Sequence, residues 1–215
     1  LPIYITTNYD HFMEAALINH ARQPVSDFCR WNEYLLKDEV YADLSKNFSK
    51  GAFSIGEAKL SSVLDQGSEY KPTVERPLVY HLYGDIAAPA SMVLTEKDYF
   101  DFVINLHTSQ ENTMLPSVIL KSLATSSLLF IGYNLDDTNF RVIFQGFISL
   151  QKTNIRPTSL SVHVPQGYSK KKAKLIMEYL SLYTQNFYDL NIHWGDINEF
   201  ILEFKTRWTN FKNMP

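Results

Sequence analysis

The sequence predicts an α/β fold whose mainly parallel sheet is covered by helices on both faces. Five short apolar runs with strand character recur at wide intervals along the 215 residues. Segments with the apolar spacing of helices separate these runs. Strands and helices that alternate in this way are typical of a parallel sheet that is buried on both sides.

The expected elements follow one another from the first residues to the last. Predicted strands cover residues 3–7, 78–83, 127–132, 159–164 and 190–194. Predicted helices cover residues 10–21, 95–106, 113–124, 135–150, 169–182 and 197–211. Residues 22–77 break the alternation with a mixed polar and aromatic composition, and we expect an insertion lobe there within one domain that spans residues 1–215.

Composition excludes several classes of protein. A hydrophobic content of 45% is enough for a sizeable core, and a net charge of -3 gives no general basic field for binding nucleic acid. The single cysteine, Cys29, excludes an internal disulfide and a zinc ribbon built on cysteine pairs. No apolar run approaches the roughly 18 to 20 residues that cross a bilayer. We therefore expect a soluble, cytoplasmic protein that does not bind membranes.

The first predicted strand ends in small polar residues, and a helical pattern follows at once. Thr6, Thr7, Asn8 and Asp10 stand at this strand end. Ligands of open α/β sheets bind at the carboxyl ends of the strands, so these side chains are candidate binding residues. The alternative is that they only cap the helix that follows.

The second predicted strand ends in His81, Leu82 and Tyr83. Alternation along a strand places His81 and Tyr83 on one face. His81 is a candidate general base, and Tyr83 is a candidate hydrogen-bond donor or stacking ring. The alternative for His81 is a half-buried ring bonded to a backbone carbonyl.

Two later strand ends carry weaker signals. After the strand at 127–132, Gly132 permits a close backbone approach, and Tyr133 and Asn134 follow it. After the strand at 190–194, Gly195 precedes Asp196, which we expect to cap the next helix. The sequence contains neither a glycine-rich phosphate loop nor a serine-hydrolase elbow, and no pair of His or Cys residues has metal-ligand spacing. We therefore expect no metal.

Taken in order, these segments resemble the sirtuin-like domains of bacteria, especially those of anti-phage defence proteins that hydrolyse NAD. The resemblance extends from residue 3 to about residue 211. It rests on the strand end Thr-Thr-Asn-Tyr-Asp, the strand His-Leu-Tyr-Gly-Asp, the later Val-Leu-Thr-Glu-Lys-Asp-Tyr, the segment Leu-Leu-Phe-Ile-Gly-Tyr-Asn-Leu, and the closing Trp-Gly-Asp with its helix.

The resemblance implies a Rossmann-type, doubly wound fold with an NAD site. It places Asn8 at the nicotinamide ribose and the attacking water, with Asp10 near the nicotinamide. It places Gly132, Tyr133 and Asn134 near ribose and phosphate. The same resemblance puts Gly195 and Asp196 beside adenine.

Departures from the family pattern bear on its activity. The family's catalytic histidine immediately precedes the glycine, and this chain has Tyr83 there, with His81 two residues earlier. The family's phosphate loop belongs to a first β-α unit that is absent from these residues, so we expect the chain to be part of a longer polypeptide. Deacylating sirtuins carry four zinc-binding cysteines, so deacylation is not expected.

Two functions remain open from the sequence. The first is cleavage of NAD to nicotinamide and ADP-ribose in anti-phage defence, with Asn8, His81 and Tyr83 as the catalytic candidates. The second is an inactive module that binds NAD or ADP-ribose, or that mediates assembly. The resemblance also implies a bacterial cytoplasmic location, a homo-oligomer, and attached or partner sensor domains.

Overall fold

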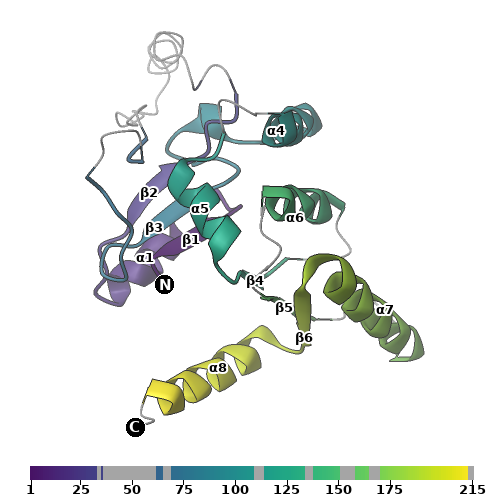
Figure 1. The fold of residues 1–215 in the computed structure, drawn as a ribbon. Helices are drawn as coiled ribbons and strands as arrows, with labels where there is room; N and C mark the ends of the chain where they lie inside the picture. The colour runs from purple at the N-terminus through teal and green to yellow at the C-terminus, as the bar shows by residue number, and fades with distance from the viewer. Residues whose placement is uncertain are drawn as a thin grey trace. The chain divides into compact units, whose positions relative to one another are not determined.

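The computed structural model describes residues 1–32, 35, 62–64, 69–108, 114–133, 138–150, 158–164 and 170–212. The chain divides into two compact units, Leu1–Val118 and Ile119–Pro215. Each unit contains a three-stranded parallel sheet (Figure 1).

The first unit is built around a buried central strand. Its elements are β1 (Ile3–Thr6), α1 (Phe12–Asn19), β2 (Val25–Phe28), β3 (Leu78–His81), the 3-10 turn η1 (Pro89–Ser91) and α4 (Glu96–Thr108). The strand order is β1-β3-β2, and both outer strands run parallel to β3. Every residue of β3, the central strand, is buried. The carboxyl ends of β1 and β3 therefore lie next to each other.

The second unit repeats the parallel arrangement. After α5 (Ser117–Thr125), which crosses the boundary, come β4 (Leu129–Ile131), α6 (Thr138–Leu150), β5 (Ser159–His163), α7 (Lys170–Tyr188), β6 (Leu190–Trp194) and α8 (Ile197–Lys212). The strand order is β4-β5-β6, with β5 parallel to both neighbours. Within the described part of the chain, no helix combines the length and the apolar character needed to cross a membrane.

Each unit has its own apolar interior. In the second unit, Phe130, Phe144 and Leu190 form a buried cluster, in which the two phenylalanine rings meet edge to face at 5.0 Å. In the first unit, Cys29 is fully buried and its thiol lies 3.8 Å from the Met114 carbonyl oxygen. Burial raises the pKa of the Cys29 thiol to about 12, so the thiolate is disfavoured in the folded protein.

The structure confirms the α/β prediction and each of the predicted strands and helices, with ends shifted by a few residues. The strands lie in two three-stranded sheets, and one of them, β2, was not predicted. It begins the stretch 22–77, and its sequence Val-Ser-Asp-Phe carries a buried Asp27 that pairs with Arg30 at 2.8 Å. A paired acid in a strand breaks the apolar pattern that would reveal it. Most of 22–77 lies outside the described residues, so the insertion lobe stays a prediction.

The turn after β3 has no room for a side chain. Gly84 has φ +96°, a conformation that L side chains rarely adopt. A Cβ atom there would lie 2.2 Å from the backbone oxygen of Ser91. Glycine at this position thus allows η1 to pack directly against the turn that leaves β3.

We expect Gly84→Ala to lower the free energy of unfolding by about 4 kcal/mol or more, because the clash is with backbone and adds to the strain of the positive φ. Gly132→Ala is the matched control. Gly132 has φ +80° but no described atom within 4 Å of its Cβ position, so only about 1 to 2 kcal/mol is expected. Urea denaturation of both variants measures the difference, and equal losses would contradict the close approach.

Candidate functional site

The candidate site lies where β1 and β3 end side by side. Thr6 pairs with His81 in the register of the two strands. Beyond this pair, the Nδ1 atom of His81 lies 3.0 Å from the backbone oxygen of Asn8. A carbonyl oxygen only accepts, so Nδ1 carries the proton of this hydrogen bond. The structure therefore brings together two of the predicted site residues, Asn8 and His81.

The backbone of Asn8 is held while its side chain is exposed. The Asn8 amide N–H donates to Thr6 Oγ1 at 3.1 Å, and the Asn8 carbonyl accepts from His81. Among the described residues, both hydrogen bonds of Asn8 use backbone atoms, and the residue as a whole is exposed. Thr6 thus shapes the turn, and the amide side chain of Asn8 is presented at the sheet edge. Thr7, between them, is half-buried.

Asp10 has a structural role at the start of α1. Its Oδ1 atom accepts a hydrogen bond of 3.0 Å from the backbone N–H of Phe12, the first residue of the helix. This contact matches the capping alternative for Asp10 and satisfies one of the free amide groups of the helix. The contact with nicotinamide that the resemblance implies stays a prediction.

His81 and Glu14 form a buried pair between β3 and α1. His81 Nε2 lies 2.8 Å from Glu14 Oε1, and the Ser26 hydroxyl donates to the same oxygen. Burial alone would lower the pKa of His81, but the hydrogen bonds to Glu14 and Asn8 and the charges of Glu14 and Asp85 outweigh it and raise the pKa. The contact with Glu14 therefore favours the protonated form of His81.

The pKa of Glu14 moves in the complementary direction. Burial would raise it, but hydrogen bonds from His81 and Ser26, together with the histidine charge, lower it below its ordinary value of 4.5. The second carboxylate oxygen, Oε2, is buried and has no hydrogen-bond partner among the described residues. Among the described residues, Glu14 therefore has one oxygen with two donors and one oxygen with none.

A second histidine stands beside this pair. His11 Nε2 lies 2.8 Å from Oδ1 of the buried Asp85, and its ring meets the ring of His81 edge-on with 5.6 Å between centroids. One ligand atom from each of His11, Glu14 and His81 lies within 4.8 Å of the other two. This set could hold a metal ion. Spacing along the sequence missed it, because His81 comes from a distant strand and Glu14 is not a His or Cys.

The expectation that His81 and Tyr83 share one face is wrong. It required the strand to continue through Tyr83, but β3 ends at His81 and residues 82–83 form a turn. The Tyr83 ring instead packs edge-on against Tyr99 and Phe102 of α4, at 6.4 and 5.4 Å. The His81 ring contacts the Glu14 side chain of α1. The two rings therefore contact different helices.

The remaining predicted residues lie in the second unit. Gly132 and Tyr133 follow β4, and Gly195 and Asp196 follow β6, so both pairs lie at the carboxyl edge of the same parallel sheet. Asp196 Oδ1 accepts from the backbone N–H groups of Asn198 and Glu199, which confirms the predicted cap of α8. The Tyr133 ring packs edge-on against a core ring, Phe130. Asn134 lies outside the described residues.

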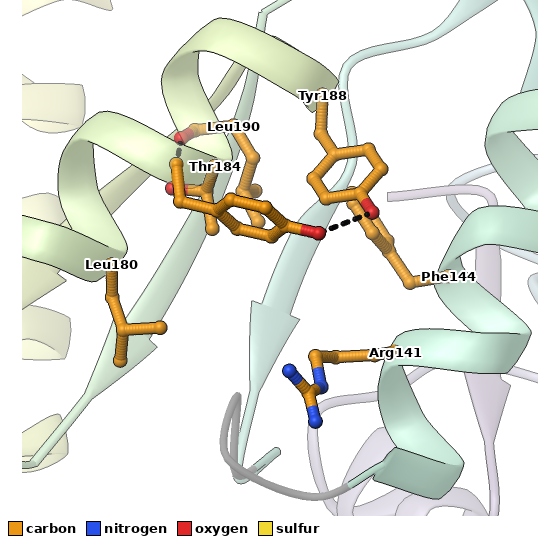
Figure 2. A pocket seen from close by; sticks show the side chains of 7 residues that line it. Arg141, Phe144, Leu180, Thr184, Tyr188 and Leu190 are labelled. Atoms are coloured by element: carbon orange, nitrogen blue, oxygen red, sulfur yellow. Dashed lines mark hydrogen bonds between the residues drawn. The ribbon is translucent and has the colours of Figure 1, made fainter.

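A small pocket in the second unit does not coincide with these residues. Figure 2 shows its lining from α6, α7 and β6, which consists of Arg141, Phe144, Leu180, Tyr183, Thr184, Tyr188 and Leu190. Its volume of about 10 Å³ is close to the smallest that holds a single water molecule. The pocket is therefore a gap in the packing and not a nucleotide site.

A sequence model of the SIR2-like domain family matches residues 2–183, and the chain belongs to this family. The two parallel sheets and their helices are consistent with the Rossmann-like fold of a sirtuin-type domain. SIR2-like domains bind NAD, and the family includes NAD-dependent enzymes, so the function of this chain is NAD-related. No curated protein matched the chain.

The pair of His81 and Glu14 contributes to the pH dependence of stability. The pKa of His81 is raised, so its contribution is complete below the ordinary value of 6.5 and is lost as the pH rises through the raised pKa. The pKa of Glu14 is lowered, so its contribution is complete above 4.5 and is lost as the pH falls through the lowered pKa. The pair stabilises the fold most between these two values.

In that range we expect Glu14→Gln to lower the free energy of unfolding by about 3 kcal/mol, because the buried imidazolium loses its counter-charge. The loss shrinks above the raised pKa of His81, where the neutral ring accepts a hydrogen bond from the new amide. Urea denaturation in EDTA over a series of pH values measures it. The control Glu203→Gln removes an exposed pair with Arg207 and should change stability by about 1 kcal/mol at most. A loss for Glu14→Gln that is independent of pH would contradict the ion pair.

Proposed function

We propose that this SIR2-like domain binds NAD and cleaves it to nicotinamide and ADP-ribose. The observation that carries the proposal is the position of Asn8 at the carboxyl end of β1, with its carbonyl bonded to His81. Nucleotide ligands of open parallel sheets bind at this edge. The side chain of Asn8 is exposed there, while the backbone that carries it is fixed.

Cleavage of the glycosidic bond passes through an oxocarbenium-like state, so the protein must hold the ribose and place a water molecule. The amide of Asn8 can do both, because its nitrogen donates and its oxygen accepts. A fixed backbone keeps that amide in one orientation before the substrate arrives. Asn8 is therefore the residue to which we assign the reaction.

His81 acts in this proposal as a positioning residue. Its Nδ1–H group donates a hydrogen bond to the Asn8 carbonyl, and its Nε2 atom is paired with Glu14. Neither nitrogen is available to take a proton from water. Tyr83 lies in the turn after β3, and its ring packs against Tyr99 and Phe102 of α4. Positioning by Asn8, rather than proton removal by a side chain, is the contribution that these contacts support.

In the second unit, taken by itself, the resemblance assigns further residues to NAD, and we propose them as binding residues. No described atom lies within 4 Å of the position that a Cβ of Gly132 would take, which suits a close approach of ribose or phosphate, and Tyr133 follows it. Asn134 is proposed for the same part of NAD. Gly195 and Asp196 follow the outer strand β6 and are proposed to lie beside adenine. In the first unit, Thr6, Thr7 and Asp10 are proposed as binding residues together with Asn8.

A second candidate function is an inactive module that binds NAD or ADP-ribose, or that mediates assembly. It is favoured by Tyr83, which stands where the family's catalytic histidine is expected, and by the engagement of both nitrogens of His81. In either case we propose a cytoplasmic bacterial protein of anti-phage defence, which acts as a homo-oligomer with attached or partner sensor domains. These roles follow from the resemblance to defence proteins.

We expect Asn8→Ala to lower NAD turnover at least 100-fold while the fold persists, because the hydrogen bonds of Asn8 among the described residues use only its backbone. The assay is release of nicotinamide by the full-length polypeptide, with NAD binding measured in parallel. Asn19→Ala is the control, since Asn19 is an exposed asparagine at the opposite end of α1, and its turnover should equal that of the unmodified protein.

A fully active Asn8→Ala protein would defeat the catalytic assignment. NAD binding without turnover in the full-length polypeptide would support the binding module instead. If the full-length polypeptide neither binds NAD nor cleaves it, assembly would remain as the function.

A further inference from the structure

We propose that His11, Glu14 and His81 form a binding site for a divalent transition-metal ion, with zinc as the expected occupant. One ligand atom from each residue lies within 4.8 Å of the other two. Two imidazoles and one carboxylate are a common protein ligand set for zinc sites that keep one position open. The proposal does not depend on NAD cleavage.

Each histidine has one nitrogen bonded to an acceptor outside the cluster. His81 Nδ1 donates to the Asn8 carbonyl, and His11 Nε2 donates to the carboxylate of Asp85. The other nitrogen of each ring offers a lone pair only when it carries no proton, so an ion at this site would displace the proton that His81 shares with Glu14. Metal-binding histidines almost always have such an outer acceptor, because it fixes the tautomer and orients the ring.

Glu14 adds a second, independent observation. Its Oε2 atom is buried and has no hydrogen-bond partner among the described residues, although Oε1 accepts from both His81 and Ser26. A buried carboxylate oxygen without a donor is costly. A cation held by this carboxylate would remove that cost, which the ion pair with His81 alone does not.

The elements around the cluster suit an ion that enters from solvent. Glu14 on α1 and His81 on β3 are buried, whereas the His11 side chain is 45% exposed. The rigid elements therefore provide two ligands, and the exposed ring provides the third. A water molecule can take the open position. Bound there, the ion would link the start of α1 to the strand end that holds the carbonyl of Asn8.

The test is titration of the EDTA-treated, dialysed protein with Co²⁺, read by visible absorption, and with Zn²⁺, read by calorimetry and thermal unfolding. We expect one ion per chain, the absorption band of a coordinated cobalt ion, and a rise in Tm with zinc. The His11→Ala variant should bind both ions at least 10-fold more weakly and should lose the absorption band of the coordinated cobalt ion. Because His11 is exposed, this substitution is compatible with folding; Glu14→Gln is the second variant, expected to weaken binding likewise.

His20→Ala is the matched control, because His20 is an exposed histidine at the opposite end of α1. Its affinity should equal that of the unmodified protein. Absence of binding, an unchanged affinity in His11→Ala, or an equal loss in His20→Ala would each overturn the proposal. None of these readouts involves NAD, so they leave the proposed cleavage to its own test.

Discussion

The contact on which the site depends is the buried ring of His81, which bonds to Asn8 through one nitrogen and to Glu14 through the other. A histidine in the fully buried central strand is tolerated only because both nitrogens are satisfied. The same bonds join three segments that are distant along the chain: the turn after β1, the helix α1 and the end of β3. The hydrogen bonds that satisfy the buried histidine are therefore the same ones that fix the geometry of the site.

In this arrangement, the residues that the sequence analysis assigned to one candidate site have different roles. His81 supports the backbone, Asp10 holds the start of α1, and the side chain of Asn8 remains exposed to a ligand. The histidine that sequence reasoning offered as a base thus has the alternative role, that of a ring bonded to a backbone carbonyl. In the proposed cleavage, a site of this kind would contribute through fixed positions more than through proton transfer.

Elements with a regular apolar period could be predicted from the sequence, as could the cap at Asp196, because local spacing determines both. Strand β2 could not, since its buried Asp27 is stabilised by Arg30 in a way that apolar patterns do not show. The cluster around His81 was missed for a related reason. Its members come from α1 and β3, and only the fold brings them together. Tyr83 was misplaced because the end of a strand is not visible in alternation alone.

The burial of Cys29 makes the first unit separately observable. Its thiol is fully buried and is the only one in the sequence. A thiol reagent therefore reacts when the first unit opens, and the reaction does not report on the second unit. The three tryptophans divide differently, with Trp31 in the first unit and Trp194 and Trp208 in the second. Labelling kinetics and fluorescence together can therefore report whether the two units unfold in concert or one after the other.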